Sequence, residues 1–173
     1  GREREFWQLN VDMFGVDEIA GEAEVIMMAD GVMKAFGAKD KDFVIKINNR
    51  KLINFMMAQY LGLDAVQAQL MVKLFDRKDK IGSVEFSDQA REILGEAAIE
   101  GLPKIDALLN AKSMAELPVE IRNSSVVEEV QELFTLLERG GVKSAIFDIT
   151  LMRGLDYYTG TVFEVFDMDP DNN

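Results

Sequence analysis

The chain of 173 residues is 48% hydrophobic, contains 3 prolines and has a formal net charge of −12. This length and apolar content allow one ordinary domain or two small ones and exclude a disordered chain, while the negative charge argues against a surface that binds nucleic acid over its whole extent. Because cysteine and histidine are both absent, disulfides, thiolate nucleophiles, Cys/His zinc sites and Ser-His catalytic pairs are excluded.

The first predicted element is a strand over Phe6–Phe14. Apolar and polar residues alternate along it, and this period of two predicts a half-buried strand. Its polar face carries Gln8, Asn10 and Asp12, whose side chains would project from one side about 6–7 Å apart. They could hold a small polar ligand between an amide and a carboxylate. A solvated outer face of a sheet is the alternative that the pattern leaves open.

A helix, a strand and a second helix are predicted next. The helix over Val16–Phe36 has a repeating apolar stripe, with Gly37 as its C-terminal cap. The segment Phe43–Ile47 is rich in β-branched residues and predicts a strand. The pair Asn48-Asn49 then starts a helix that we expect over Arg50–Leu61.

Residues 64–123 carry helical patterns only. The predicted helices are short and are broken at Gly82-Ser83, Gly95, Gly101-Leu102-Pro103 and Leu117-Pro118. Because no strand pattern occurs in this section, we predict a helical insertion over 63–123, set into a sheet-containing domain formed by 1–62 and 124–173.

The last predicted elements are one helix and two strands. Ser124 or Ser125 caps a helix over Val126–Glu138, and a Gly-Gly pair ends it. The strands are predicted over Ala145–Met152 and Thr161–Phe166. Strands at both ends, with the helices segregated between them, predict an α+β protein with an antiparallel sheet rather than an alternating α/β fold.

The segment between the last two strands carries further candidate site residues. Arg153 is an always-charged planar donor that suits a phosphate or a carboxylate. Tyr157 and Tyr158 offer stacking surfaces and hydroxyls, and they alternate in direction if the chain is extended, so at most one belongs to the core. Flanking glycines permit close approach of a ligand. The alternative is a turn in which Arg153 pairs with Asp156 and the tyrosines cover a core edge.

A cationic run over Lys73–Lys80 lies in the predicted insertion. It could contact a phosphate backbone, but Asp76 and Asp79 dilute it, and such a run is usually a solvated face. Neither a Gly-x-x-x-x-Gly-Lys-Ser/Thr loop nor a strand-following Gly-x-Gly-x-x-Gly occurs. A nucleotide would therefore have to be bound by another arrangement.

The sequence has no segment with the roughly 18 continuous apolar residues of a membrane span. Its first residues also lack the apolar region of a secretory signal. We therefore expect a cytoplasmic location and no membrane partner. Because the chain does not begin with Met, we expect it to be a piece of a longer protein.

Two stretches together resemble the histidyl-tRNA synthetases, a family of class II aminoacyl-tRNA synthetases. Gly1–Gly15 is similar to the second half of motif 2 in those enzymes, and Leu151–Glu164, with its run Arg-Gly-Leu-Asp-Tyr-Tyr-Thr-Gly, is similar to their histidine-specific motif. Glu22–Ile26 and Ile47–Leu52 also fit the family's connecting pattern. The resemblance spans essentially the whole chain and implies a class II catalytic core with an antiparallel sheet.

The resemblance implies a role for each candidate residue. Gln8 and Asp12 would lie at the amino group of a histidine substrate. Tyr157 and Tyr158 would lie around the imidazole side of the pocket. Arg153 would lie near the substrate carboxylate and the α-phosphate of ATP, where it is the residue expected to act in catalysis.

The cofactor that the resemblance implies is ATP, with Arg2 on its side of the site. Mg²⁺ would accompany ATP, through ligands that the sequence does not identify. Since negative charge grows on the phosphoryl centre during adenylation, a fixed guanidinium such as that of Arg153 is the expected stabiliser, without a protein base. The partners implied for the intact parent are histidine, tRNA(His) and a second subunit of a homodimer.

The chain also departs from the family pattern. It starts inside motif 2 and lacks motif 1, motif 3 and the anticodon-binding domain, so we do not expect this piece alone to aminoacylate tRNA. The first function expected is a fragment of a histidine–tRNA ligase. The alternative is a synthetase-like regulatory subunit of histidine biosynthesis that binds histidine without charging tRNA. Retention of Gln8, Asp12, Arg153 and both tyrosines favours the ligase, because a regulator is free to lose the arginine that faces phosphate.

Overall fold

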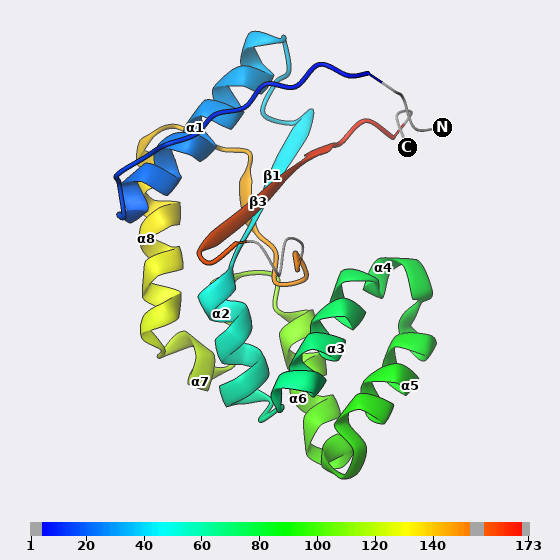
Figure 1. Cartoon of the computed structure of the whole chain (residues 1–173). Helices are drawn as coiled ribbons and strands as arrows, with labels where there is room; N and C mark the ends of the chain where they lie inside the picture. The colour runs from blue at the N-terminus through cyan, green and yellow to red at the C-terminus, as the bar shows by residue number, and fades with distance from the viewer. Residues whose placement is uncertain (1–4, 153–157, 171–173) are drawn as a thin grey trace.

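A computed structural model describes residues 5–152 and 158–170 of the chain. Figure 1 shows the helices and strands in these ranges. The α-helices are α1 Ile19–Ala35, α2 Arg50–Phe55, α3 Ala65–Asp76, α4 Lys78–Ile81, α5 Ser83–Leu94, α6 Ala98–Asn110, α7 Val119–Arg122 and α8 Ser125–Arg139. The π-helix η1 spans Met56–Tyr60, and the 3₁₀ turns are η2 Gly95–Ala97 and η3 Met114–Glu116. The strands are β1 Phe43–Asn49, β2 Ala145–Phe147 and β3 Thr161–Asp167.

The three strands form a mixed sheet in the order β2-β1-β3. β3 is antiparallel to β1, with Ile47 opposite Phe163, whereas β2 is parallel to β1, with Ile47 opposite Phe147. The predicted α+β class is confirmed, and the prediction of a purely antiparallel sheet is wrong. The physical reason is the helical connection between β1 and β2, which is long enough to return the chain in the same direction.

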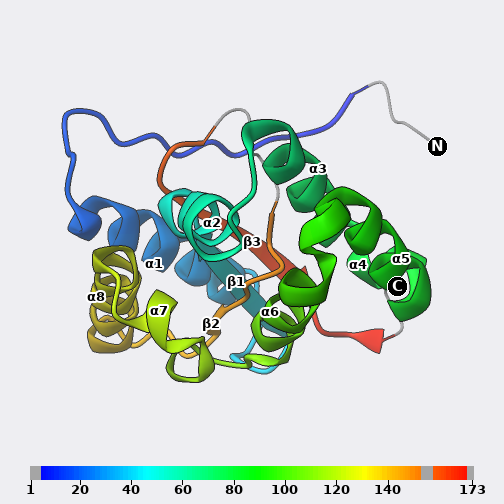
Figure 2. The ribbon, with the colours of Figure 1, turned by 90° about the horizontal axis from the view of Figure 1, so that it is seen from below.

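Helices α1 and α8 lie side by side next to the sheet, and Figure 2 shows the sheet between this pair and helices α3 to α6. Alternate residues of β1 are buried against the pair. The resulting hydrophobic cluster consists of Ala23, Ile26, Phe43, Ile45, Ile47, Leu133, Leu137 and Val142. This cluster fixes the middle of β1, so the end of β1 at Asn49 has a defined place relative to α1.

A second hydrophobic cluster joins the helices of the predicted insertion to α2, η1 and α8. It includes Met56 and Met57 of η1, and the rings of Phe75 and Phe86 meet edge to face with centroids 5.5 Å apart. Ile149 and Met152 also belong to this cluster, although they follow β2. The helical region therefore packs against the segment that leads directly to Arg153. The division into 1–62 with 124–173 and 63–123 stays a prediction.

Several predicted helix boundaries are confirmed by backbone geometry. The Asn49 side chain accepts a hydrogen bond from the backbone N–H of Lys51 at 2.8 Å and so caps α2. Gly82 and Gly95 separate helices as predicted, with φ of +78° and +57°. The predicted break at Gly101 is wrong, since α6 continues through it. A Cβ at this residue would lie 2.7 Å from Leu94 Cδ2, so packing against α5 explains the glycine.

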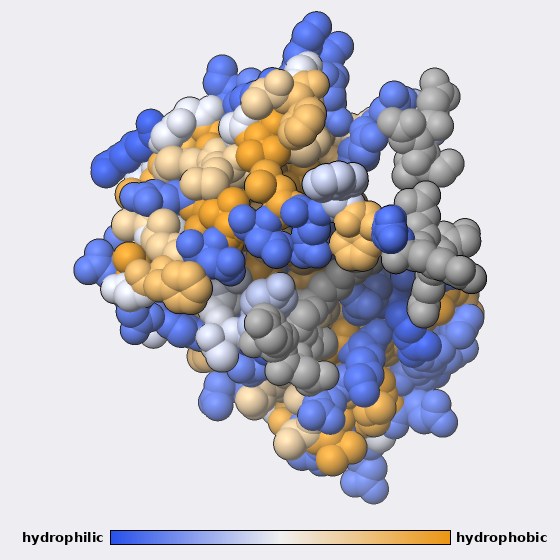
Figure 3. Space-filling model, turned by 45° about the horizontal axis from the view of Figure 1, so that its top comes forward, coloured by the Kyte–Doolittle hydropathy of each residue, from blue (hydrophilic) through white to orange (hydrophobic). Residues whose placement is uncertain are grey.

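The predicted strand over Phe6–Phe14 is wrong, because the structure assigns no strand between residues 5 and 18. A strand needs a hydrogen-bonded neighbour, and no strand of the described ranges pairs with this segment. Its apolar side chains are exposed instead, and Trp7 and Phe14 are the most exposed of them. Figure 3 shows orange, hydrophobic residues exposed among blue, hydrophilic ones on the face of the molecule that it presents.

The predicted strand over Ala145–Met152 is too long, because β2 ends at Phe147. Asp148 then turns the chain: its side chain accepts hydrogen bonds from the backbone and the hydroxyl of Thr150. Across residues 5–152 and 158–170, no helix combines the length and the apolar character that a membrane crossing requires.

Candidate functional site

Three of the predicted site residues lie within the described ranges, namely Gln8, Asp12 and Tyr158. Arg2, Arg153 and Tyr157 lie outside the described residues. Gln8 is exposed and donates a hydrogen bond to the side chain of Asn10 at 2.7 Å. Tyr158 is 52% exposed, so its side chain lies outside the core. This agrees with the expectation that at most one of the two adjacent tyrosines belongs to the core.

Asp12 lies in a surface cavity of 690 Å³ between the N-terminal segment, α1, α2 and α8. The N-terminal segment approaches α1 closely at Gly21, where a Cβ would lie 2.9 Å from Met13 Sδ. This close approach places Asp12 beside the first turn of α1. The glycine therefore matters for the position of a predicted site residue.

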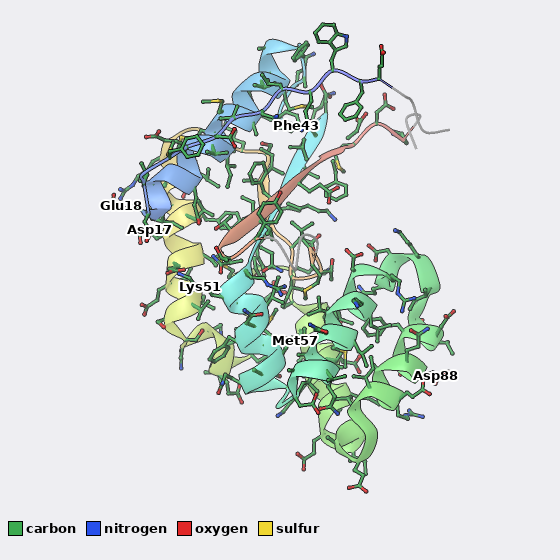
Figure 4. The ribbon with its side chains drawn as sticks, in the orientation of Figure 1. Asp17, Glu18, Phe43, Lys51, Met57 and Asp88 are labelled. Atoms are coloured by element: carbon green, nitrogen blue, oxygen red, sulfur yellow. The ribbon has the colours of Figure 1, made fainter. Side chains whose placement is uncertain are left out.

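The cavity is strongly acidic. Its charged lining residues are Asp12, Asp17, Glu18, Glu22, Lys51, Glu129 and Glu132. Lys51 Nζ pairs with Glu129 at 2.6 Å, and this hydrogen bond and charge raise the pKa of Lys51 above its ordinary 10.5. Figure 4 shows Lys51 at the start of α2 and Asp17 and Glu18 ahead of α1. One cation among six carboxylates leaves a negative cavity that can receive a cationic group such as an ammonium.

The buried end of β1 holds the chain that leads into the candidate segment 153–158. The side-chain amide of Asn48 donates hydrogen bonds to the carbonyl oxygens of Ile149 and Leu151, both at 3.2 Å. Its Oδ1 accepts the backbone N–H of Asn49 at 2.9 Å. Asn48 is 0% exposed, so these three bonds satisfy an amide that water cannot reach.

The chain that leaves the candidate segment is held at the same end of β1. The backbone N–H of Arg50 donates to the carbonyl of Gly160 at 2.8 Å. Asn49 Nδ2 donates to Thr161 Oγ1 at 3.4 Å. The Thr161 hydroxyl in turn donates to the carboxylate of Glu22 in α1. The described residues on either side of the candidate segment are therefore anchored on three consecutive residues, 48 to 50.

Glu22 connects the two halves of the predicted site. It is a half-buried lining residue of the acidic cavity that also contains Asp12, and it accepts the hydrogen bond of Thr161, three residues after Tyr158. Asp12, near the start of the chain, and Thr161, at the start of β3, are therefore both linked to Glu22 in the same region of the fold.

A third polar link supports the turn after β2. Lys46 Nζ lies 2.8 Å from Asp148 Oδ2 and 4.7 Å from the centroid of the Phe166 ring. Burial by itself would raise the pKa of Asp148, but hydrogen bonds from Lys46 and Thr150 hold that pKa below its ordinary 3.8. Asp148 is thus kept ionised at neutral pH and fixes the turn to the central strand.

Sequence reasoning missed the roles of Glu22, Asn48 and Asn49. The Asn pair was interpreted only as a helix start, which is correct for Asn49, and Glu22 only as part of a connecting pattern. The available signal was the position of two amides at the end of an apolar strand, where a buried amide needs hydrogen-bond partners; both are buried in the structure. The identity of their acceptors depends on tertiary structure and was not in the pattern.

The predicted cationic run covers the end of α3 and the first three residues of α4. Arg77 is occupied locally, since it donates to Gln89 at 3.1 Å and to the Lys73 carbonyl at 3.4 Å. Lys73 also lines a 340 Å³ cavity with Arg50. The charged residues of the run other than Lys78 are exposed, as expected of the solvated face that the sequence pattern favours. Within the described part of the chain, no three acidic residues are grouped so that they could hold a metal ion.

The amino-acid sequence matches a family model described as histidyl-tRNA synthetase over residues 1–172. A histidine–tRNA ligase from Leptospira biflexa is 35% identical to it over 175 residues. That alignment covers 99% of this chain and 39% of the relative. The chain therefore spans well under half of the length of this curated relative.

Solved structures agree with the sequence match at the level of the fold. The crystal structure of histidyl-tRNA synthetase from a Nostoc species has a TM-score of 0.75 and 24% identity, covering 90% of this chain and 38% of that one. A Bacillus halodurans structure, described as an ATP phosphoribosyltransferase regulatory subunit/histidyl-tRNA synthetase, has a TM-score of 0.60 and 21% identity, covering 89% and 41%. At these identities the likeness shows the fold alone.

Proposed function

The chain belongs to the histidyl-tRNA synthetase family, as its two motifs predicted, and from this premise we propose that its parent protein is a histidine–tRNA ligase. The parent joins the histidine carboxylate to the α-phosphoryl group of ATP, which forms histidyl adenylate and releases pyrophosphate. It then transfers the histidyl group to tRNA(His) and releases AMP. The described residues belong to a class II catalytic core, formed by 1–62 and 124–173, with a helical insertion over 63–123. A homodimer is proposed for the parent.

The observation that carries the proposal is the anchoring of the candidate segment. Asn48 binds the carbonyl of Leu151 before it, and Arg50 binds the carbonyl of Gly160 after it. Glu22 links Thr161 to the acidic cavity that contains Asp12. This arrangement supports a single pocket to which the N-terminal segment and the late motif both contribute.

The proposed roles follow from the chemistry of each group. The acidic cavity attracts the histidine ammonium, and Asp12 with Gln8 would bind it. Tyr157 and Tyr158 would select the imidazole by hydrogen bonding, the kind of contact that discriminates most strongly between amino acids. Arg153 would stabilise charge on the α-phosphoryl group as the histidine carboxylate attacks it.

ATP is proposed as the second substrate, with Arg2 on its side of the site. Mg²⁺ would accompany the triphosphate and neutralise part of its charge. The residues that would hold Mg²⁺ are not assigned in this proposal.

Histidine-dependent exchange of pyrophosphate into ATP by the full-length parent tests the proposal. The expected result is exchange that requires histidine and is not supported by other amino acids. If the parent binds histidine and shows no exchange, the ligase proposal is wrong.

The second candidate is a regulatory subunit that binds histidine without activating it. It is favoured by one observation, the fold shared with the Bacillus halodurans protein whose description names both functions. The presence of Arg153 argues against it, because binding histidine alone requires no phosphate-facing cation. The exchange assay separates the two candidates, since only the ligase forms an adenylate.

A further inference from the structure

We propose that Asn48 is a positioning residue for adenylation: its buried side chain fixes the main chain at Ile149 and Leu151, two residues before Arg153 in the sequence. This inference rests on the proposed function, in which Arg153 acts at the phosphoryl group. Asn48 itself would touch neither histidine nor ATP.

The side-chain amide of Asn48 binds the main chain of the segment that follows β2. Both donated bonds of Asn48 Nδ2 end on main-chain oxygens, of Ile149 and Leu151. A bond to a main-chain atom fixes the path of the backbone rather than the rotamer of one side chain. Because Asn48 is the sixth residue of β1 and is 0% exposed, its own position is set by the sheet and by the hydrophobic core around it.

The turn that Asn48 binds is also held by other hydrogen bonds. Asp148 N–H donates to the carbonyl of Ile47 at 3.0 Å, and Leu151 N–H donates to the carbonyl of Asp148 at 3.1 Å. The Asp148 side chain is bound by Lys46 and Thr150. The turn is therefore hydrogen-bonded to β1 at both of its ends. Asn48 supplies the hydrogen bond at the later end, at Leu151, which precedes the candidate segment in the sequence.

Arg153, the proposed catalytic residue, follows this turn closely in the sequence. Leu151 is two residues before Arg153, and the intervening Met152 is 0% exposed in the second hydrophobic cluster. A shift of the Leu151 carbonyl would thus be passed on through one buried residue. Arg153 must meet a phosphoryl group at hydrogen-bond distance, and a displacement of about 1 Å in such a group can cost roughly 100-fold in rate.

Asparagine suits this position better than similar residues. Aspartate has the same shape but no donor, so it would set a carboxylate against two carbonyl oxygens. Leucine has a similar size but would leave both carbonyls without their present donor. Serine retains one donor on a shorter side chain.

The test uses the full-length parent and the variants Asn48→Asp and Asn48→Ser, with Asn110→Asp as the control. Asn110 is an exposed residue at the end of α6, so the control makes the same chemical change away from the site. The expected result for Asn48→Asp is a fall in kcat of histidine-dependent exchange by roughly 10- to 100-fold, with a smaller change in the KM for histidine. Asn110→Asp should behave as the wild type.

A double-mutant cycle with Arg153→Ala separates positioning from general loss of stability. If Asn48 acts through Arg153, Asn48→Asp should reduce kcat little or not at all once Arg153 is alanine. Equal fold-losses in both backgrounds would overturn the proposal. If Asn48→Asp does not fold, the same cycle with Asn48→Ser decides, and wild-type kcat in that variant would also overturn it.

Failure of the proposed function is distinguishable from failure of this inference. A wild-type parent without exchange would reject the ligase function and, with it, a role for Asn48 in adenylation. A wild-type parent with exchange, combined with unchanged kinetics in both Asn48 variants, would reject only the positioning role.

Discussion

Thr161, the first residue of β3, donates a hydrogen bond to Glu22 of α1, which lies 139 residues earlier in the chain. Thr161 also accepts a hydrogen bond from Asn49 at 3.4 Å. One hydroxyl therefore joins α1, the end of β1 and the start of β3. Because Glu22 lines the acidic cavity with Asp12, this link sets the relation between the two stretches that carry the candidate residues.

Thr161→Val tests the importance of this link. Valine has nearly the same shape as threonine but no hydroxyl, so Glu22 would lose its donor and could turn away from β3. We expect kcat for histidine-dependent exchange in the parent to fall by roughly 10-fold, and Thr161→Ser to retain most of the activity.

The matched control is Thr135→Val. The Thr135 hydroxyl donates only along α8, to the Gln131 carbonyl, and this residue is exposed. Its variant should keep wild-type kinetics. If Thr161→Val also keeps them, Glu22 is not held by this hydroxyl in the active protein.

Gly160→Ala should disturb the same link by a different route. A Cβ at this residue would lie 2.8 Å from Glu22 Oε1, closer than van der Waals contact permits. The Glu22 carboxylate would have to move away from Thr161. We expect a fall of roughly 10- to 100-fold in kcat for exchange, with melting temperature recorded to exclude unfolding.

Gly31→Ala is the control for this substitution, and we expect it to raise the stability of the protein. Gly31 lies in the interior of α1 with no atom near an added Cβ. Alanine there should stabilise the protein by about 0.5–1 kcal/mol, because glycine disfavours the helix. Activity should not change. A stabilised Gly160→Ala variant with full activity would contradict the close approach to Glu22.

The pattern of the sequence predicted β1, β3 and most of the helices because each of these elements has a local signal. β1 and β3 are alternating or β-branched runs, and Asn49 caps α2 where expected. The direction of β2 had no such signal, since it depends on how the long helical connection returns. Gly101 was misinterpreted because a glycine that permits helix packing looks the same in sequence as one that ends a helix.

Only those candidate site residues that have a recognisable residue type and spacing were predicted from the sequence. Asp12 and Tyr158 were singled out by residue type and spacing, whereas Asn48 and Glu22 were not, since their hydrogen-bond partners are more than 100 residues away. The N-terminal segment shows the opposite case. Its alternation predicts a strand, but alternation describes only the two faces of a strand and cannot supply the hydrogen-bonded neighbour.

The Lys46–Asp148 pair gives a pH dependence to stability. The pKa of Asp148 is lower in the folded protein than its ordinary 3.8, so the ionised form is favoured by folding. Its stabilising contribution is complete well above pH 3.8 and is lost as the pH falls through the lowered pKa. At neutral pH we expect Asp148→Asn to lower the free energy of unfolding by about 1–3 kcal/mol.

Urea unfolding at a series of pH values checks this prediction. The difference between wild type and Asp148→Asn should be largest at neutral pH and should shrink as the pH falls below the ordinary value. Asp88→Asn is the control, since Asp88 is an exposed residue of α5 (Figure 4), whereas Lys46 belongs to β1 and Asp148 follows β2. A difference for Asp148→Asn that does not depend on pH would show that its charge is not the cause.

Arg153→Ala tests the catalytic assignment most directly. In adenylation the guanidinium would stabilise charge that develops only as the carboxylate attacks the α-phosphoryl group, so its loss should act on the transition state more than on bound histidine. We expect kcat for exchange to fall by roughly 100-fold or more, the size seen when one donor to a developing charge is removed. Histidine affinity, measured by calorimetry without ATP, should change much less.

Two comparisons make the Arg153 result specific. Arg139→Ala removes an exposed arginine at the end of α8 and should leave both exchange and histidine affinity as in the wild type. Arg153→Lys keeps the charge but loses the planar pair of donors, so it should recover only part of the rate. Equal losses of exchange and histidine affinity in Arg153→Ala would place the arginine at the amino acid alone and remove its proposed role at the phosphate.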